Sequence, residues 1–146
     1  MRLRVGTERD APQIRALLES EDLPVSDLST AAPHFLVACD VSDQIVAAGA
    51  LQWFGKTALL RSIVVAPPAR GTGLGQRVVQ ALEGAAREGK AGQLVLLTLT
   101  AKSFFERQGY QVIDRASVPD DVQGSEEFRS LCPASAICMA KKLASS

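Results

Sequence analysis

The sequence has no excess of either charge, only one histidine, and three cysteines without tight metal-ligand spacing. Lysine plus arginine and aspartate plus glutamate number 16 each, so no basic surplus indicates a nucleic-acid partner. No apolar run approaches the ~18 residues that a membrane span needs, and the N-terminus has no signal-peptide core. The odd number of cysteines is typical of a reduced protein, and we expect a cytoplasmic location.

Cys132 and Cys138 are six residues apart, but two thiols alone make a poor metal site. We therefore expect no metal and a structural role for both, with binding of trivalent arsenic as the weaker alternative. The single histidine, His34, is expected at the surface, and Glu126 and Glu127 on a solvated helix face.

Apolar residues, by contrast, make up 47% of the 146 positions, enough for one hydrophobic core. No repeat, low-complexity tract or linker divides the chain. We expect a single domain over residues 1–146.

The most informative stretch runs from Leu59 to Gly89. Its first residues, up to Val65, predict a buried strand that two prolines end, and its last part predicts an amphipathic helix. The turn between them is Arg70-Gly71-Thr72-Gly73-Leu74-Gly75. The first N–H groups of a helix have no partner inside it, and glycines allow close approach of a ligand, so this arrangement is suited to bind an anion.

Spacing excludes two common phosphate loops. A nucleoside-triphosphate loop ends in Gly-Lys-Ser/Thr, where this sequence has Gly75-Gln76-Arg77. A dinucleotide loop needs a third glycine, and that position is Gln76. A glycine-rich turn without any ligand remains the alternative.

Periodicity and turn residues predict a mixed sheet flanked by helices, hence an α/β (α+β) fold. A first helix is expected after Thr7 or Asp10, and a short second one before Pro33. Asp114–Leu131 is polar and weakly helical. The other expected elements are strands Met1–Val5, Phe35–Cys39, Ile45–Trp53, Thr57–Val65, Leu94–Leu97, Tyr110–Ile113 and Ala134–Lys142, and helices Thr72–Glu88 and Thr100–Gln108.

Two spaced motifs resemble those of the GNAT superfamily, the acyl-CoA-dependent N-acyltransferases. Arg70-x-x-Gly73-x-Gly75 resembles the pyrophosphate loop of these proteins. Ala101-x-x-Phe104-Phe105-x-x-x-Gly109-Tyr110 resembles the signature of their fourth helix. The resemblance implies a central, mostly antiparallel sheet of about seven strands, splayed between strands four and five, with about four flanking helices.

The resemblance also implies an acetyl-CoA site at this splay. The Val64 N–H would face the thioester carbonyl, and Thr98 stands where the family has the asparagine that holds pantetheine. The other residues implied to contact the coenzyme are Ile63, Val65, Arg70, Gly71, Thr72, Gly73, Leu74, Gly75, Gln76, Phe104 and Arg107.

The sequence departs from the family where acid and base are usual. The acid is commonly a tyrosine at the position of Phe105, and the base a carboxylate at that of Arg61, which stays protonated. Tyr110 is a poor substitute because that position usually packs in the core. We assign no general acid or base, and water-mediated proton transfer or unassisted loss of the thiolate remain open.

By strand parity, Arg61 shares the face of Ile63 and Val65 unless a bulge shifts it. There a guanidinium would hold a carboxylate, which suggests an amino acid as the acceptor. A surface salt bridge is the alternative. The other residues proposed near the acceptor are Leu23, Ser26 and Ser135.

Three segments, Glu127–Met139, Leu23-Pro24-x-x-Asp27-Leu28 and Leu60-Arg61-Ser62, are similar to the small arsenic-resistance N-acetyltransferases. Through these proteins they are similar to the acetyltransferase domain of N-acetylglutamate synthase. The resemblance implies a glutamate-like acceptor amine and a monomer or homodimer. The alternatives are an acyl-CoA-binding sensor without turnover and a protein or peptide N-acetyltransferase.

Overall fold

A computed structural model describes residues 1–28, 33–131 and 135–143. Its seven strands form one sheet in the order β1-β2-β3-β4-β5-β7-β6. β4 and β5 pair in parallel, whereas the other neighbours pair antiparallel. The strands are β1 (Arg2–Val5), β2 (His34–Cys39), β3 (Ile45–Phe54), β4 (Thr57–Val65), β5 (Gln93–Thr98), β6 (Gln111–Val112) and β7 (Ile137–Lys142).

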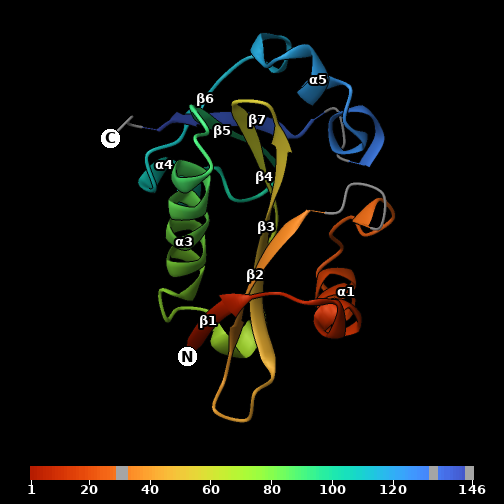
Figure 1. The fold of residues 1–146 in the computed structure, drawn as a ribbon, viewed down its shortest axis with the longest axis vertical. Helices are drawn as coiled ribbons and strands as arrows, with labels where there is room; N and C mark the ends of the chain where they lie inside the picture. The colour runs from red at the N-terminus through yellow and green to blue at the C-terminus, as the bar shows by residue number, and fades with distance from the viewer. Residues whose placement is uncertain (29–32, 132–134, 144–146) are drawn as a thin grey trace.

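Helices cover both faces of this sheet, with α3 and α4 on one face and α1 and α5 on the other (Figure 1). The sequence-based fold is therefore confirmed. The helical segments are η1 (Glu8–Asp10), α1 (Ala11–Ser20), η2 (Pro67–Ala69), α3 (Leu74–Glu88), α4 (Lys102–Arg107), η3 (Arg115–Ser117), α5 (Asp120–Gln123) and the π-helical turn η4 (Glu127–Leu131). No helix of the described ranges is both long and apolar enough to cross a membrane.

The start of one helix differs from the prediction, and the start of another agrees with it. The helix predicted from Thr72 begins at Leu74 instead, because Gly73 precedes it in the left-handed region with φ +78°. The first helix opens with a turn capped by Thr7, whose backbone N–H donates to Asp10 Oδ2 at 2.8 Å. The short second helix falls partly on residues 29–32, outside the described ranges.

The predicted splay lies between β4 and β5. Their pairing is confined to Thr57↔Gln93, Ala58↔Leu94 and Leu59↔Val95. Beyond Val95, β5 continues to pair with β7 up to Thr98 but no longer with β4. A gap therefore opens in the sheet where β4 approaches the glycine-rich loop.

A bulge in β4 lies just before this gap. Ala48 pairs with Val64 and Ala50 with Arg61, so two β4 residues, one of them Ser62 at φ +58°, stand opposite one residue of β3. The extra residue shifts the alternation of side chains. Arg61 therefore shares the face of Val64 and not that of Ile63 and Val65, which corrects the parity expectation.

The chain after β6 covers the sheet rather than lying in solvent. Val118, Val122 and Phe128 are buried against Leu59 and Val95 of the central strands. This layer faces the same side as α1. The expectation of a solvated helix face is wrong for Glu127, whose exposed fraction is 4%, whereas Glu126 is exposed.

Candidate active site

The glycine-rich loop is shaped as an anion cradle. Gly71 and Gly73 both have φ near +80°, a conformation that L side chains rarely adopt, and nothing lies within 4 Å of a Cβ built on either. The first backbone N–H of α3 that bonds within the helix is that of Arg77, which donates to Gly73 O at 3.1 Å. The N–H groups of residues 74–76 precede it at the positive end of the helix dipole.

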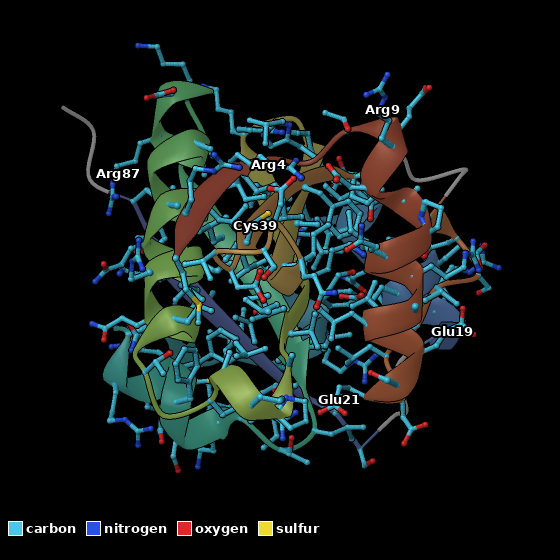
Figure 2. The ribbon with its side chains drawn as sticks, turned by 90° about the horizontal axis from the view of Figure 1, so that it is seen from below. Arg4, Arg9, Glu19, Glu21, Cys39 and Arg87 are labelled. Carbon is cyan, nitrogen blue, oxygen red and sulfur yellow. The ribbon has the colours of Figure 1, made fainter. Side chains whose placement is uncertain are left out.

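This loop lies directly beside the splay. A Cβ added to Gly75 would be 3.5 Å from Val65 Cγ2 and 3.6 Å from Phe104 Cζ. Arg70 Nε donates to Val65 O at 3.0 Å, and its guanidinium pairs with Glu21 at the end of α1. Figure 2 shows Glu21 near the short helical turn η2, which precedes this loop. The loop is thus fixed to the last residue of β4.

The hydrogen-bond alternation of β4 decides which amides face the gap. Ala66 N–H donates to Val46 O at 2.8 Å, so antiparallel alternation turns Val64 N–H toward its partner Ala48. The polar groups of Ile63 and Val65 then face the open side, in agreement with the Arg70 bond to Val65 O. This geometry favours Ile63 N–H over Val64 N–H as the amide that can meet a ligand in the gap.

A cavity of about 410 Å³ occupies the gap. Leu60, Ile63 and Leu96 line it on the α3 face, and Arg61 and Leu97 on the opposite face, so it passes through the sheet. Its other lining residues are Glu21, Asp22, Leu23, Pro24, Ser62, Thr98, Leu99, Thr100, Ala101, Phe104, Phe105, Glu127 and Ala136.

Neither the aromatic residues that line the cavity, Phe104 and Phe105, nor the neighbouring Tyr110 supplies an acid. Phe105 is buried between Phe104 and Tyr110 in edge-to-face contacts, with ring centroids 5.1 and 5.6 Å apart. Tyr110 is in the core, as expected, and its hydroxyl donates to Glu83 Oε2 at 2.9 Å. Burial, and then the Glu83 charge, raise the pKa of Tyr110 far above its ordinary value. Tyr110 therefore does not release a proton at neutral pH.

Arg61 forms the centre of a buried charge cluster. Its two terminal nitrogens each donate to one oxygen of Asp27 at 2.6 Å, and Nη1 also donates to Gln52 Oε1 at 3.0 Å. Glu127 approaches from the other side, with Oε1 3.5 Å from Arg61 Nε. The exposed fractions of the Arg61, Asp27 and Glu127 side chains are 0, 4 and 6%. The planar fork of Arg61 is thus already engaged by a carboxylate of its own chain.

The surroundings of Glu127 raise the pKa of its carboxyl group. Burial raises its pKa to about 7, the Arg61 charge opposes the shift, and the Asp27 charge adds to it. Because Glu127 lines the cavity and Asp27 does not, a carboxyl that titrates near neutrality faces the gap.

The structure brings some predicted site residues together and not others. Leu23, Arg61, Ile63, Thr98 and Phe104 line the cavity. The Thr98 hydroxyl accepts a hydrogen bond from Ala101 N–H at 3.0 Å and keeps its own proton to donate. Arg107, Ser26 and Ser135 are exposed and do not line the cavity. Cys138 is buried, and Cys132 lies outside the described residues.

Sequence reasoning gave Asp27 and Glu127 no role at the site, although both lie in the segments that carry the resemblance to the small arsenic-resistance N-acetyltransferases. A usable signal was available, because Arg61 interrupts an otherwise apolar strand and a buried arginine requires carboxylate partners. Nothing in the local pattern indicates which of the 16 acidic residues supply them.

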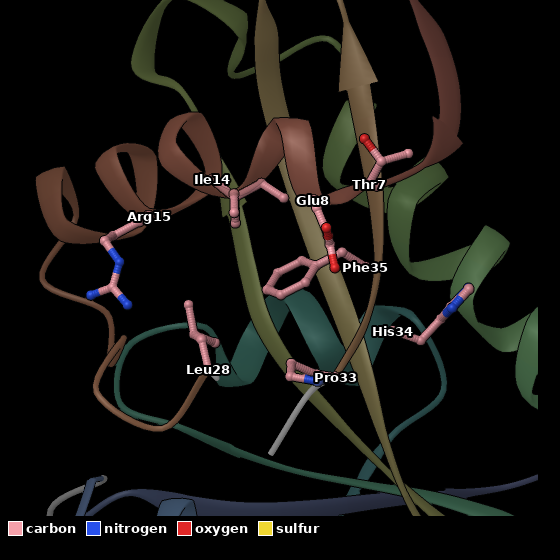
Figure 3. Close-up of a pocket in the computed structure, with 10 residues that line it drawn as sticks. Thr7, Glu8, Ile14, Arg15, Leu28, Pro33, His34 and Phe35 are labelled. Atoms are coloured by element: carbon pink, nitrogen blue, oxygen red, sulfur yellow. The ribbon is translucent and has the colours of Figure 1, made fainter. Parts of the chain in front are cut away.

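A larger cavity of about 760 Å³ lies between α1 and β2 (Figure 3). Glu8 and Arg15 of the helical side and His34 of the strand lie at it. Leu28 and Pro33 also line it. Residues 29–32 between them are outside the described ranges, so the volume is the space that the described residues alone enclose. It shares no lining residue with the gap, and we assign no chemistry to it.

A splayed sheet with a glycine-rich loop leading into a helix at the splay defines the class of acyl-CoA-dependent N-acyltransferases. The acetyltransferase (GNAT) domain family matches residues 31–112, more than half of the chain. The chain therefore belongs to this family and is an N-acetyltransferase. No curated protein matches its sequence.

Solved structures show the same fold. Rv2747 from Mycobacterium tuberculosis, in complex with CoA and NLQ, superposes with a TM-score of 0.83 at 24% identity over 99% of this chain and 100% of that chain. N-acetylglutamate synthase from Neisseria gonorrhoeae, with coenzyme A and L-arginine, gives 0.82 at 19% identity over 97% of this chain and 33% of that one. The same enzyme with coenzyme A and N-acetyl-glutamate gives 0.82 at 17% identity over 99% and 36%. The described residues contain no cluster of histidine, cysteine and carboxylate side chains that could hold a metal ion.

Proposed function

We propose that this chain transfers the acetyl group of acetyl-CoA directly to the primary amine of a small molecule. The observation that carries the proposal is the cavity through the β4–β5 gap, which begins beside the glycine-rich loop and ends at a buried carboxylate. One side of the sheet can thus receive the coenzyme while the other receives the amine. We propose that a single domain over residues 1–146 carries both sites.

The coenzyme would bind from the loop into the gap. The amides of residues 70–75, with Gln76 at the helix start, would hold the pyrophosphate. The pantetheine arm would pair with Ile63 and Val65, whose polar groups face away from β3. Thr98 would donate to this arm, with Phe104 and Arg107 at its edge. The thioester carbonyl would accept a hydrogen bond from Ile63 N–H, in the role first expected of Val64, and developing negative charge would be stabilised there.

For the acceptor we propose an amino acid or a glutamate-like analogue, with an arsenic-containing acid as one compound to test. Arg61 is the one cation among the described residues that line the cavity. Its fork is held by Asp27, so an acidic acceptor has to replace that carboxylate. Leu23 would contact the body of the acceptor. We also keep Ser26 and Ser135 as predicted contacts of the acceptor. Both lie outside the cavity, so their segments would have to move for them to reach it.

Release of free thiol from acetyl-CoA tests the proposal. The panel contains glutamate, its phosphorus and arsenic analogues, other amino acids, polyamines and a short peptide, with acetyl-CoA binding measured separately by calorimetry. Turnover with small amines and none with the peptide is the expected result, and a preference for acids would assign the acceptor class. Binding of acetyl-CoA without any turnover would contradict the enzyme proposal and favour a sensor. Light scattering with and without acetyl-CoA distinguishes a monomer from a homodimer.

A further inference from the structure

Among the described residues that line the cavity, Glu127 is the buried acidic side chain, and its contact with Arg61 is a long one. It begins η4 and its exposed fraction is 4%. The other carboxylates that line the cavity differ, since Glu21 is paired with Arg70 and Asp22 is exposed. Asp27 is held at 2.6 Å by Arg61, whereas Glu127 lies 3.5 Å from the same guanidinium. Glu127 is therefore the second carboxylate on one arginine.

The Arg61, Asp27 and Glu127 side chains together carry one net negative charge whenever both carboxylates are ionised. Within the part of the chain that the structure describes, Arg61 of β4 and Asp27 of the loop after α1 are the charged groups that act on Glu127. On the segment of Glu127 itself, the neighbouring Glu126 is exposed. Arg115 of η3 donates to Phe128 O at 2.9 Å and lies over the Phe128 ring. A buried negative charge at the end of the gap attracts a cationic amine, which is the form in which most amines reach the enzyme at neutral pH.

An ammonium group cannot attack a thioester until it loses a proton. The positions where this family commonly carries its base and acid hold Arg61 and Phe105 here, and neither can accept that proton. Glu127 lies in the same cavity as Ile63, the residue we propose to bind the thioester carbonyl. Its pKa of about 7 is well matched to proton transfer at neutral pH.

We propose that Glu127 is the general base that deprotonates the acceptor amine. The inference rests on the proposed acetyl transfer. The Glu127 carboxylate takes one proton from the ammonium, which frees the nitrogen lone pair. The nitrogen attacks the thioester carbon, the C–N bond forms and the C–S bond breaks. The second nitrogen proton goes to the departing thiolate, so CoA leaves as the thiol and Glu127 returns its proton to water.

The test is the pH dependence of kcat/KM in four proteins: the wild type, Glu127→Gln, Glu127→Asp and the matched control Glu126→Gln. In the wild type and the control, kcat/KM should fall as the pH drops below about 7, which gives the pH profile an acid limb. Glu127→Gln should be slower by about 10²-fold and lack this limb, because a carboxamide cannot take the proton. Glu127→Asp should retain a limb at a reduced rate, which a purely structural role does not predict. Acetyl-CoA affinity should be equal in all four.

A second acceptor amine of different basicity distinguishes proton transfer to Glu127 from loss of the proton to bulk solvent before the amine binds. With Glu127 as base the limb stays in place for both amines, whereas a limb that follows the pKa of the amine overturns the proposal. A Glu127→Gln protein with the wild-type rate and limb also overturns it and leaves the acetyltransferase proposal intact. A wild type that binds acetyl-CoA but turns over no amine overturns both.

Discussion

The guanidinium of Arg61 holds both carboxylate oxygens of Asp27 at 2.6 Å, and both side chains are almost completely buried. This pair connects the loop after α1 to the bulged part of β4. The Asp27 carboxylate also occupies the two Arg61 nitrogens that would otherwise bind the carboxylate of an acidic acceptor. Removal of one partner from such a buried pair typically costs about 3–5 kcal/mol of stability, because the other charge remains buried.

Asp27→Asn should therefore shift the acid limb of activity to lower pH. The Asp27 charge raises the pKa of Glu127, and without it Arg61 stabilises the Glu127 carboxylate alone. The substitution also removes the internal carboxylate that occupies the Arg61 fork, so KM for a glutamate-like acceptor should fall if such acids are substrates. The measurement is kcat/KM against pH. Asp22→Asn is the matched control, because Asp22 lines the cavity on the same loop but is exposed. An unshifted limb in Asp27→Asn would contradict the coupling.

The fold was predictable because each of its central elements carries a strong local signal. Thr57–Val65 has the same bounds in the prediction and in the structure, and the glycine-rich turn after it locates the start of α3 within two residues. The segment after β6 was less predictable. Its buried side chains, such as Val118 and Phe128, are separated by polar residues in short turns without a regular period.

The candidate site likewise has one side that was predictable from the sequence and one side that was not. The coenzyme side depends on contiguous backbone, so a motif in sequence is also a motif in space, and the loop at residues 70–75 lies beside the splay as expected. The acceptor side depends on residues from distant segments. Ser62 at φ +58° shifts the face of Arg61, and no parity rule on the sequence alone places that bulge. Asp27 and Glu127 then meet Arg61 only through the tertiary fold.

Gly73→Glu should weaken acetyl-CoA binding by at least about tenfold, equivalent to ~1.4 kcal/mol. The new carboxylate would stand at the helix N-terminus that we propose for the pyrophosphate, and like charges repel there. Calorimetric titration with acetyl-CoA measures the effect. Gly84→Glu places the same charge on the same helix about three turns further along, where nothing lies within 4 Å of an added Cβ.

A second variant at this position separates charge from backbone strain. Asparagine tolerates the left-handed conformation better than other residues, so Gly73→Asn should retain most of the affinity. Wild-type affinity in Gly73→Glu would contradict the assignment of the loop to the coenzyme.

Gly49→Ala should destabilise the protein by about 1–3 kcal/mol through overpacking. A Cβ at this position would lie 2.6 Å from Ile63 Cδ1, 2.7 Å from Leu82 Cδ1 and 2.9 Å from Val78 Cγ1, between the sheet and α3. Urea denaturation measures the change. Gly84→Ala is the opposite case, a helical glycine in open space, and should stabilise by about 1 kcal/mol. Equal stability of Gly49→Ala and wild type would mean that α3 can move away from β3 at no cost.

Glu127→Gln should make the protein more stable than the wild type at pH 8, and the difference should disappear in acid. Folding raises the pKa of Glu127 from 4.5 to about 7, so between these values the folded state binds more protons than the unfolded state. Wild-type stability therefore falls as the pH rises through this window, whereas a glutamine carries no such dependence. The gain above pH 7 should be on the order of a few kcal/mol. Urea denaturation between pH 4 and pH 8 measures it, with Glu126→Gln as the exposed neighbouring control. A constant difference across that range would show that Glu127 does not titrate there, and the general-base proposal would fail with it.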